Sequence, residues 1–317
     1  MNRWLERLMF VWLLSAMGIG YLLHGIMGDW TGAVVILFAC MTFVTALGTR
    51  LREFGYVARH PVVLASMFIL LHAFLPVIAY LAARAFLHKT AYIVGVVLAS
   101  SIPVGVTSIM WTGMANGDLP LGLSLVSLDT LLSPIVIPLT IHVIIGHSVA
   151  LPFWTLFWGL VWMVVLPTIL GIFANELSRG RIKPAVLPIA GPVSKLSMLA
   201  VVSINVAAVT PSLAHQSGLF PILCVLFLLA GFGYLVGYGA SRAERVDRPK
   251  RVTMTYNVGM RNISAGIAIA SQYFGHMVSI PVVLAMLFQQ PFATLVFWLL
   301  GKSKPKAVSE VPVSNSV

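Results

Sequence analysis

Long apolar runs follow one another along almost the whole chain, separated by short polar connections. Each run has roughly the 20 residues that a helix needs to cross a lipid bilayer. The chain is 59% hydrophobic and only 9% charged, whereas soluble domains carry about 25% charged residues. The runs are continuous rather than alternating, which argues against a transmembrane β-barrel. We therefore predict an all-α membrane protein that crosses the bilayer many times.

Ten such runs can be delimited, and a polar tail follows the last one. We predict membrane-spanning helices at residues 8–27, 31–48, 62–84, 91–115, 119–146, 151–175, 186–210, 218–240, 251–274 and 278–300. The composition of the tail, residues 301–317, predicts a disordered segment.

Basic residues indicate how the chain lies in the membrane. Seventeen of the 20 Lys and Arg residues fall on the side of the ten-span bundle that holds both termini, whereas Arg84 and Lys89 fall on the other. The positive-inside rule places the first side, with both termini and the tail, in the cytoplasm. We therefore expect a multi-pass protein of the inner (plasma) membrane, in contact with lipid. The net charge of +11 reflects this topology and does not predict nucleic-acid binding.

The predicted span 251–274 is interrupted in its middle by polar residues. Asn257, Gly259, Arg261 and Asn262 follow one another within six positions. Such groups are costly in hydrocarbon and normally face a polar cavity that serves a function. Non-helical backbone at this depth persists only where protein or water satisfies it. The interruption therefore predicts a helix break at Gly259 beside a substrate site.

A second interruption lies in the predicted span 91–115, where Pro103 and Gly105 predict a helix break. Residues 104–108 align with residues 258–262, and residues 70–84 align with 228–242 with six identities in fifteen positions. Both similarities occur in the same order at nearly the same offset. They predict two inverted repeats of five helices, with a site where the two broken helices cross at the midplane. The half-helix N-termini at this crossing favour an anion or carboxylate.

The residues at these breaks also belong to a recognisable pattern. Its parts are Arg59-His60-Pro61, Pro76, Pro103 with Thr107-Ser108, Ser133-Pro134 and Val258-Gly259-Met260-Arg261-Asn262. From Trp30 to about Leu300 the chain resembles the bile acid:sodium symporter family, specifically its bacterial ASBT-like members.

The resemblance implies ten helices in two domains, with the fourth and ninth helices crossing. A panel domain would comprise residues 1–58 and 151–212, and a core domain would comprise residues 59–150 and 213–300. It also implies secondary transport of organic anions such as bile acids or pantoate, usually driven by two sodium ions.

The chain departs from the family at the positions that the resemblance assigns to sodium. These positions are Leu71, Ser108, Ile109, Gly122, Val126, Asn257, Val258, Met260 and Arg261. The family has glutamate where this chain has Asn257, and glutamine where it has Leu71 and Arg261. Apolar side chains and a guanidinium cannot ligate sodium. We therefore predict that the sodium sites are lost and that Arg261 supplies the positive charge permanently.

An intramembrane arginine needs a compensating charge. Asp129 lies on the face of its helix that the family turns toward sodium, so we expect an Asp129–Arg261 ion pair with a role in transport or, alternatively, in structure alone. His72 is a second candidate for coupling, because histidine titrates near neutral pH. Protons are therefore a candidate partner.

The predicted function is secondary active or facilitative transport of a small organic anion by alternating access, without sodium. The residues expected to bind the substrate are Val106, Thr107, Ser108, Asn262, Gln289 and Gln290. No ATP-binding, metal or catalytic motif is found, so we predict a monomeric carrier without a cofactor rather than an enzyme. The alternatives are a sodium:organic anion symporter with rearranged ligands and a membrane sensor that binds a ligand without transporting it.

Overall fold

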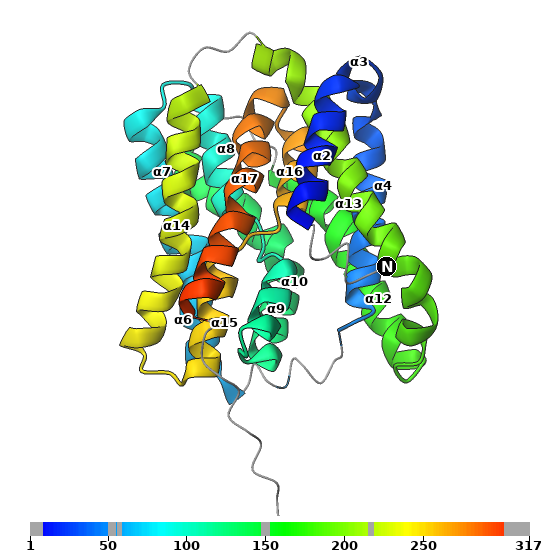
Figure 1. Cartoon of the computed structure of the whole chain (residues 1–317), viewed down its shortest axis with the longest axis vertical. Helices are drawn as coiled ribbons and strands as arrows, with labels where there is room; N and C mark the ends of the chain where they lie inside the picture. The colour runs from blue at the N-terminus through cyan, green and yellow to red at the C-terminus, as the bar shows by residue number, and fades with distance from the viewer. Residues whose placement is uncertain (1–8, 50–54, 56–58, 147–152, 215–218, 301–317) are drawn as a thin grey trace, which may run out of the picture.

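The computed structural model describes residues 9–49, 55, 59–146, 153–214 and 219–300, and these residues are helical nearly throughout (Figure 1). Within them, seven helices are long and apolar enough to cross a membrane: His24–Ala46, Pro61–Phe86, Leu119–Ile145, Phe153–Leu177, Pro188–Pro211, Leu219–Ala243 and His276–Leu300. The prediction of an all-helical membrane protein is confirmed. The predicted tail, residues 301–317, lies outside the described residues.

The helices run in chain order from the blue to the red end of Figure 1. Their bounds are α2 Met9–Leu22, α3 His24–Met27, the 3-10 turn η1 Gly28–Trp30, α4 Thr31–Ala46, α6 Pro61–Ile69, the π-helical turn η3 Leu70–Phe74, α7 Leu75–Phe86, α8 Thr90–Ser101, α9 Thr107–Met114, α10 Leu119–Ile145, α11 Phe153–Leu160, the π-helical turn η5 Val161–Val165, α12 Leu166–Leu177, α13 Ile182–Ala214, α14 Leu219–Ala243, α15 Arg248–Gly259, α16 Ile263–Tyr273 and α17 His276–Leu300.

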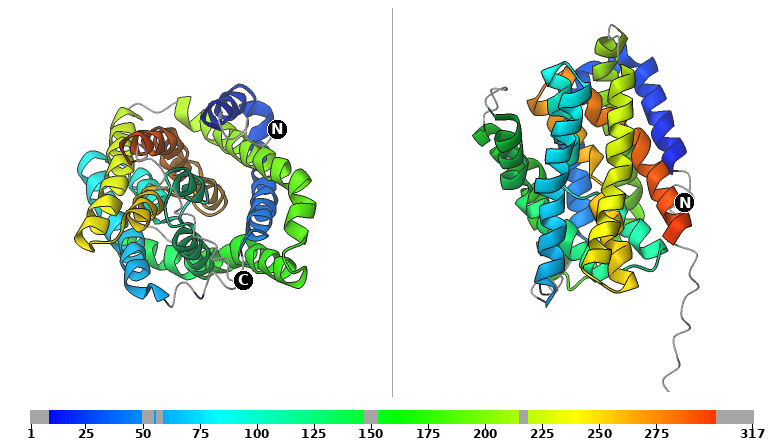
Figure 2. Two further views of the ribbon diagram at one scale, coloured as in Figure 1. Left: turned by 60° about the horizontal axis from the view of Figure 1, so that its bottom comes forward. Right: turned by 90° about the vertical axis from the view of Figure 1, so that its left-hand side faces the viewer.

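Two sets of helices pack mainly within themselves. Helix α13 packs along α2 and α4, and α4 packs against α12. Helices α7 and α17 pack against α8, while α14 packs against α15 and α17. In the left view of Figure 2, α2, α4, α12 and α13 form an arc beside the remaining helices. Helices α16 and α17 contact α13, which connects the two sets.

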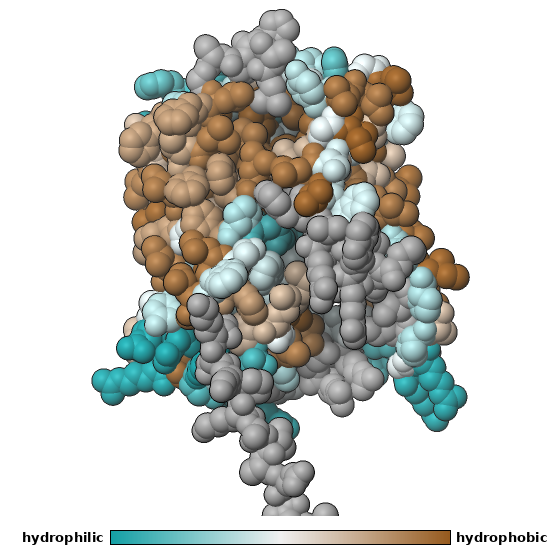
Figure 3. Space-filling model, in the orientation of Figure 1, coloured by the Kyte–Doolittle hydropathy of each residue, from teal (hydrophilic) through white to brown (hydrophobic). Residues whose placement is uncertain are grey.

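The outer surface is largely apolar, as expected for helices that face lipid. Trp154 on α11 is 67% exposed, Trp162 on η5 is 65% exposed and Phe220 on α14 is 75% exposed. Figure 3 shows a broad brown band with hydrophilic residues gathered at the lower end. The connection from α12 to α13, with Arg179 and Arg181, and the connection from α14 to α15, with Arg245, lie at that end in Figure 1.

Two helices are broken in the interior of the bundle. Residues 102–106 separate α8 from α9, and residues 260–262 separate α15 from α16. Ile102 precedes a proline and is extended, with ψ at 155°, because the proline ring disfavours the helical conformation there. Pro103 and Gly105 thus lie in the first break, and Gly259 is the last residue of α15.

Candidate functional site

The two breaks pair with each other through their main chains. Val104 and Arg261 form an isolated antiparallel bridge. The amide of Gly105 donates to the carbonyl of Met260 at 3.1 Å, and the amide of Asn262 donates to the carbonyl of Pro103 at 2.7 Å. Each break therefore satisfies main-chain groups that the other leaves without a helical partner. Irregular main chain inside a membrane requires such hydrogen bonds, because lipid cannot provide them.

Glycine is required at the breaks because the chains approach closely. A Cβ on Gly105 would lie 2.7 Å from the carbonyl oxygen of Arg261, and a Cβ on Gly259 would lie 2.4 Å from the ring of Tyr234. The first contact is to main chain, which cannot rotate away. Any side chain at position 105 would therefore separate the two breaks.

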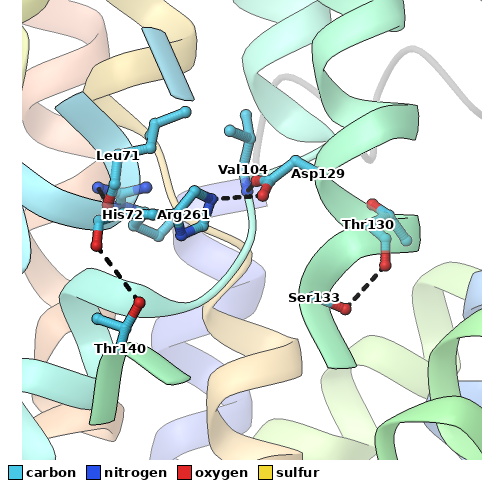
Figure 4. Close-up of polar contacts among 8 residues, drawn as sticks. All are labelled: Leu71, His72, Val104, Asp129, Thr130, Ser133, Thr140 and Arg261. Carbon is cyan, nitrogen blue, oxygen red and sulfur yellow. Dashed lines mark hydrogen bonds and ion pairs between the residues drawn. The ribbon is translucent and has the colours of Figure 1, made fainter. Parts of the chain in front are cut away.

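Asp129 on α10 holds the first break in place. Its carboxylate is fully buried, and one oxygen accepts from the amide of Val104 at 2.6 Å. The other oxygen contacts Nε2 of His72 at 2.6 Å, and Figure 4 shows these groups gathered at the crossing. A carboxylate thus caps a main-chain donor inside the membrane. The ring of His72 also packs against Phe68, with 4.6 Å between ring centroids.

The predicted ion pair between Asp129 and Arg261 is wrong, because each residue has a different partner. In the described part of the chain the side chain in contact with the Asp129 carboxylate is that of His72, at 2.6 Å. The guanidinium of Arg261 instead donates through Nη2 to the carbonyl of Leu71 at 3.2 Å. Asp129 and Arg261 still attract each other electrostatically. The three charge-bearing side chains predicted for coupling therefore form one cluster, in which His72 projects from η3 onto the carboxylate of Asp129.

The π-helical turn η3 explains why Arg261 binds Leu71. The amide of Leu75 donates to Leu70 rather than to Leu71, and Pro76, the next residue, has no N–H. The carbonyl of Leu71 is thus without a helical donor and accepts from the buried guanidinium instead. Pro76 likewise gives no N–H to the carbonyl of His72, which accepts from the hydroxyl of Thr140 on α10 at 3.3 Å.

A cavity of about 370 Å³ lies beside the crossing, between α4, α12 and α13 and the broken helices. Of the residues predicted to bind substrate, those that line it are Val106, Thr107, Asn262, Gln289 and Gln290. Ser108 does not line it: its side chain is fully buried, and its hydroxyl has no partner among the described residues.

The three amides of the cavity have a defined orientation. The side-chain oxygen of Asn262 accepts from the amide of Ala265 at 3.2 Å, which caps α16. The oxygen of Gln289 accepts from the amide of Arg261 at 3.0 Å, and that of Gln290 accepts from Nε1 of Trp111 at 3.1 Å. Because all three donors are N–H groups, the amide oxygens are committed. The NH₂ ends are left to donate to a ligand.

Sequence reasoning missed several residues of this cavity. Ser127, Thr130 and Ser133 line it from one face of α10, a pattern that their three-residue spacing could have indicated. Lys195 on α13 also lines it. The seventeen basic residues assigned to the cytoplasmic side include Lys195, although it lies inside the predicted span 186–210. An ionisable residue in a span indicates a functional role by default.

The positions that the resemblance assigns to sodium surround the crossing. The side-chain NH₂ of Asn257 donates to the carbonyl of Gly122 at 3.4 Å. A Cβ on Gly122 would meet Ile109 at 2.9 Å and Asn257 at 3.1 Å, so the space beside α10 is filled. Val126, Val258 and Met260 contribute apolar side chains that are buried there.

Two broken helices that meet beside a cavity inside a bundle of apolar helices form the arrangement found at the binding sites of secondary transporters. The chain belongs to the Sodium Bile acid symporter family, whose model matches residues 34–216. It is 32% identical over 290 residues to the uncharacterized protein YbaS of Bacillus subtilis (strain 168), covering 91% of this chain and 95% of that protein. Together with the apolar helices, the bacterial relatives indicate a multi-pass protein of the plasma membrane.

Two other relatives have sodium in their names. The uncharacterized sodium-dependent transporter YocS of Bacillus subtilis (strain 168) is 27% identical over 274 residues, 86% of this chain and 84% of that protein. The probable sodium/metabolite cotransporter BASS1, chloroplastic, of Oryza sativa subsp. japonica is 27% identical over 237 residues, 74% of this chain and 58% of that protein.

The residues at the crossing do not fit a sodium ion. A hard cation requires several oxygen ligands, drawn from carboxylates, carbonyls, hydroxyls and water. The carbonyl of Leu71 is taken by a guanidinium, and the carboxylate of Asp129 is taken by His72 and the amide of Val104. Oδ1 of Asn257 and the hydroxyl of Ser108 are the buried oxygens at these positions that have no partner in the described chain. Two neutral oxygens beside a fixed cation do not form a sodium site.

Proposed function

We propose that this protein is a secondary active or facilitative carrier of a small organic anion, bile-acid-like or pantoate-like, that works without sodium. The observation that carries the proposal is the position of Arg261. Its guanidinium lies at the crossing of the broken helices, bonded to the carbonyl of Leu71 and attracted by Asp129. A permanent charge there takes the place of a bound cation, so the carrier needs no ion to complete its site.

The composition of the cavity supports an anion as the substrate. Arg261 and Lys195 line it, and none of its described lining residues is an aspartate or glutamate. Its three amides offer NH₂ groups, as their oxygens are already bonded. A carboxylate supplies acceptors for these donors and a negative charge for the cations. A volume of about 370 Å³ lies in the range of small-molecule sites.

The proposed mechanism is alternating access between two domains. We assign α2, α4, α11, α12 and α13 to a panel domain, and α6 to α10 with α14 to α17 to a core domain, with two five-helix inverted repeats and ten spans in total. The packing of α13 along α2 and α4, and of α14 along α15 and α17, supports this division. Movement of the core against the panel would expose the cavity to each side in turn.

The proposed topology places both termini in the cytoplasm. The basic residues Arg179, Arg181 and Arg245 at one end of the bundle support this orientation. We further propose that the carrier acts as a monomer. Protons are the coupling ion to test first, because the ion pair of Asp129 with His72 contains a histidine.

The test is counterflow in proteoliposomes that contain sodium or, in its place, potassium. We expect equal exchange of a labelled organic anion in both salts and loss of exchange in Arg261→Gln, since the guanidinium is replaced by a neutral group. Arg242→Gln, at an exposed position at the end of α14, is the matched control and should exchange normally. Exchange that requires sodium, or an Arg261→Gln variant that exchanges normally without sodium, contradicts the proposal.

A further inference from the structure

The cavity has a second cation, on a different wall from the crossing. Lys195 lies in α13, within the part of that helix, Pro188–Pro211, that is apolar and long enough to span a membrane. Its side chain is half-buried and lines the cavity with Ser194 and Met198 from the same helix. A lysine inside a span costs free energy, and such residues normally serve a transported ligand or its path.

The two walls offer different binding groups. The crossing contributes the NH₂ ends of Asn262, Gln289 and Gln290 and the guanidinium of Arg261. The α13 wall contributes an ammonium, which is a compact point charge with three donors. A ligand that reaches from one wall to the other can therefore place one acceptor-rich acidic group on the amides and another on Lys195.

Hydroxyl groups lie along the same cavity, and some of them can only accept. The hydroxyl of Thr42 on α4 donates its proton to the carbonyl of Phe38 at 2.9 Å, and that of Thr168 on α12 donates to Val164 at 2.7 Å. Both threonines line the cavity. With their protons committed to their own helices, they present lone pairs to a ligand. They suit a ligand that carries a hydroxyl group besides its acidic groups.

We propose that Lys195 binds a second acidic group of the substrate, so that the cavity selects a short, hydroxylated organic dianion over the corresponding monoanion. This inference rests on the proposed function of anion transport and narrows its substrate class. Electrostatics favours this pairing. Arg261 lines the cavity from the crossing and Lys195 lines it from α13, so the two cations stand on different walls. Two separated cations match two separated carboxylates.

The test compares two probes that differ in one group. Malate has a carboxylate where 3-hydroxybutyrate has a methyl group, and the two molecules are otherwise alike. We expect the wild-type protein to exchange malate with at least tenfold higher apparent affinity than 3-hydroxybutyrate. Lys195→Gln should lower the affinity for malate at least tenfold and leave that for 3-hydroxybutyrate within about twofold. Lys195→Arg should restore much of the preference, because it keeps the charge.

The outcomes separate this inference from the proposed function. Equal affinity for both probes in the wild type, or an unchanged preference in Lys195→Gln, overturns the role of Lys195 and leaves anion transport standing. Exchange of neither probe nor any other organic anion contradicts the carrier function itself. Size-exclusion profiles and thermal stability of the variants show whether they fold. An equal loss for both probes in a folded Lys195→Gln variant also overturns the inference, since a merely structural lysine would act on both.

Discussion

Replacing Asp129 by asparagine tests how the crossing is stabilised. The carboxylate is fully buried and makes two contacts at 2.6 Å, to the amide of Val104 and to Nε2 of His72. In Asp129→Asn the side-chain oxygen can still accept from Val104, and the NH₂ can donate to Nε2 of His72 once the imidazole proton has moved to Nδ1. Both contacts then survive as neutral hydrogen bonds. A bond to a charged group contributes about 1.5–3 kcal/mol and a neutral one about 0.5–1.5 kcal/mol. The expected loss of stability is therefore about 2–3 kcal/mol.

The measurement is equilibrium unfolding in mixed micelles, followed by tryptophan fluorescence. The matched control is Asp118→Asn, which makes the same change at the N-cap of α10, where the aspartate accepts from the amide of Leu121 at 3.0 Å. Asparagine caps a helix about as well as aspartate, so this variant should remain within about 0.5 kcal/mol of the wild type.

A double-mutant cycle examines the electrostatic part of the argument. If Asp129 compensates the charge of Arg261, Asp129→Asn should cost less in an Arg261→Met background, and the coupling should lie within about 0.5–3 kcal/mol. An Asp129→Asn variant as stable as the Asp118→Asn control would refute the reasoning about the two contacts. If the stability losses of Asp129→Asn and Arg261→Met are strictly additive, Asp129 does not compensate the charge of Arg261.

Two further predictions concern close helix contacts, and both use a second glycine of the same helix region as control. Gly105→Ala should destabilise the protein by about 1–3 kcal/mol or more, because its Cβ would lie 2.7 Å from the main chain of Arg261. Gly113→Ala, whose Cβ would have its nearest atom at 3.5 Å, should fold normally. Thermal denaturation in detergent distinguishes the two variants, and equal melting temperatures would contradict the prediction. Gly20→Ala should disrupt the packing of α2 on α13, since its Cβ would lie 2.3 Å from the carbonyl oxygen of Ser203. The Cβ of Gly18→Ala would have no atom within 4 Å, so this variant should be neutral or stabilising by up to about 1 kcal/mol. A Gly20→Ala variant that melts at the temperature of the wild type would show that the two helices can separate without loss of stability.

The helices, their breaks and some polar residues of the cavity could be predicted from the sequence. The apolar runs predicted the helices because main-chain groups in a bilayer must be satisfied within their own segment. Pro103 and Gly259 marked the breaks because proline lacks a donor and glycine permits close approach. Gln289 and Gln290 were recognisable as polar residues in an apolar span.

The partner of Asp129 could not be predicted in the same way. The expected pairing with Arg261 was based on charge and on the helix face of Asp129. The π-helical turn at residues 70–74 leaves the carbonyl of Leu71 free to accept from Arg261 instead. Hydrophobic periodicity over a few residues does not reveal one extra residue in a turn. Pro76 was the available signal, since a proline leaves an earlier carbonyl without a donor. Lys195 was misread because it was counted with the basic residues of the cytoplasmic side, although it lies well inside the predicted span 186–210.

The bridge between Val104 and Arg261 has a consequence for how such a protein can change. The joint is made by the amides and carbonyls of residues 103–105 and 260–262, and the side chains of Asp129 and Gln289 bind the amides of Val104 and Arg261. The side chain of Arg261 itself takes no part in it. Every residue except proline carries both groups. The side chain at position 261 can therefore be exchanged while the geometry of the joint is kept. If Arg261 takes the place of a bound cation as proposed, a single substitution at this position changes the coupling ion and leaves the main-chain joint between the two broken helices intact.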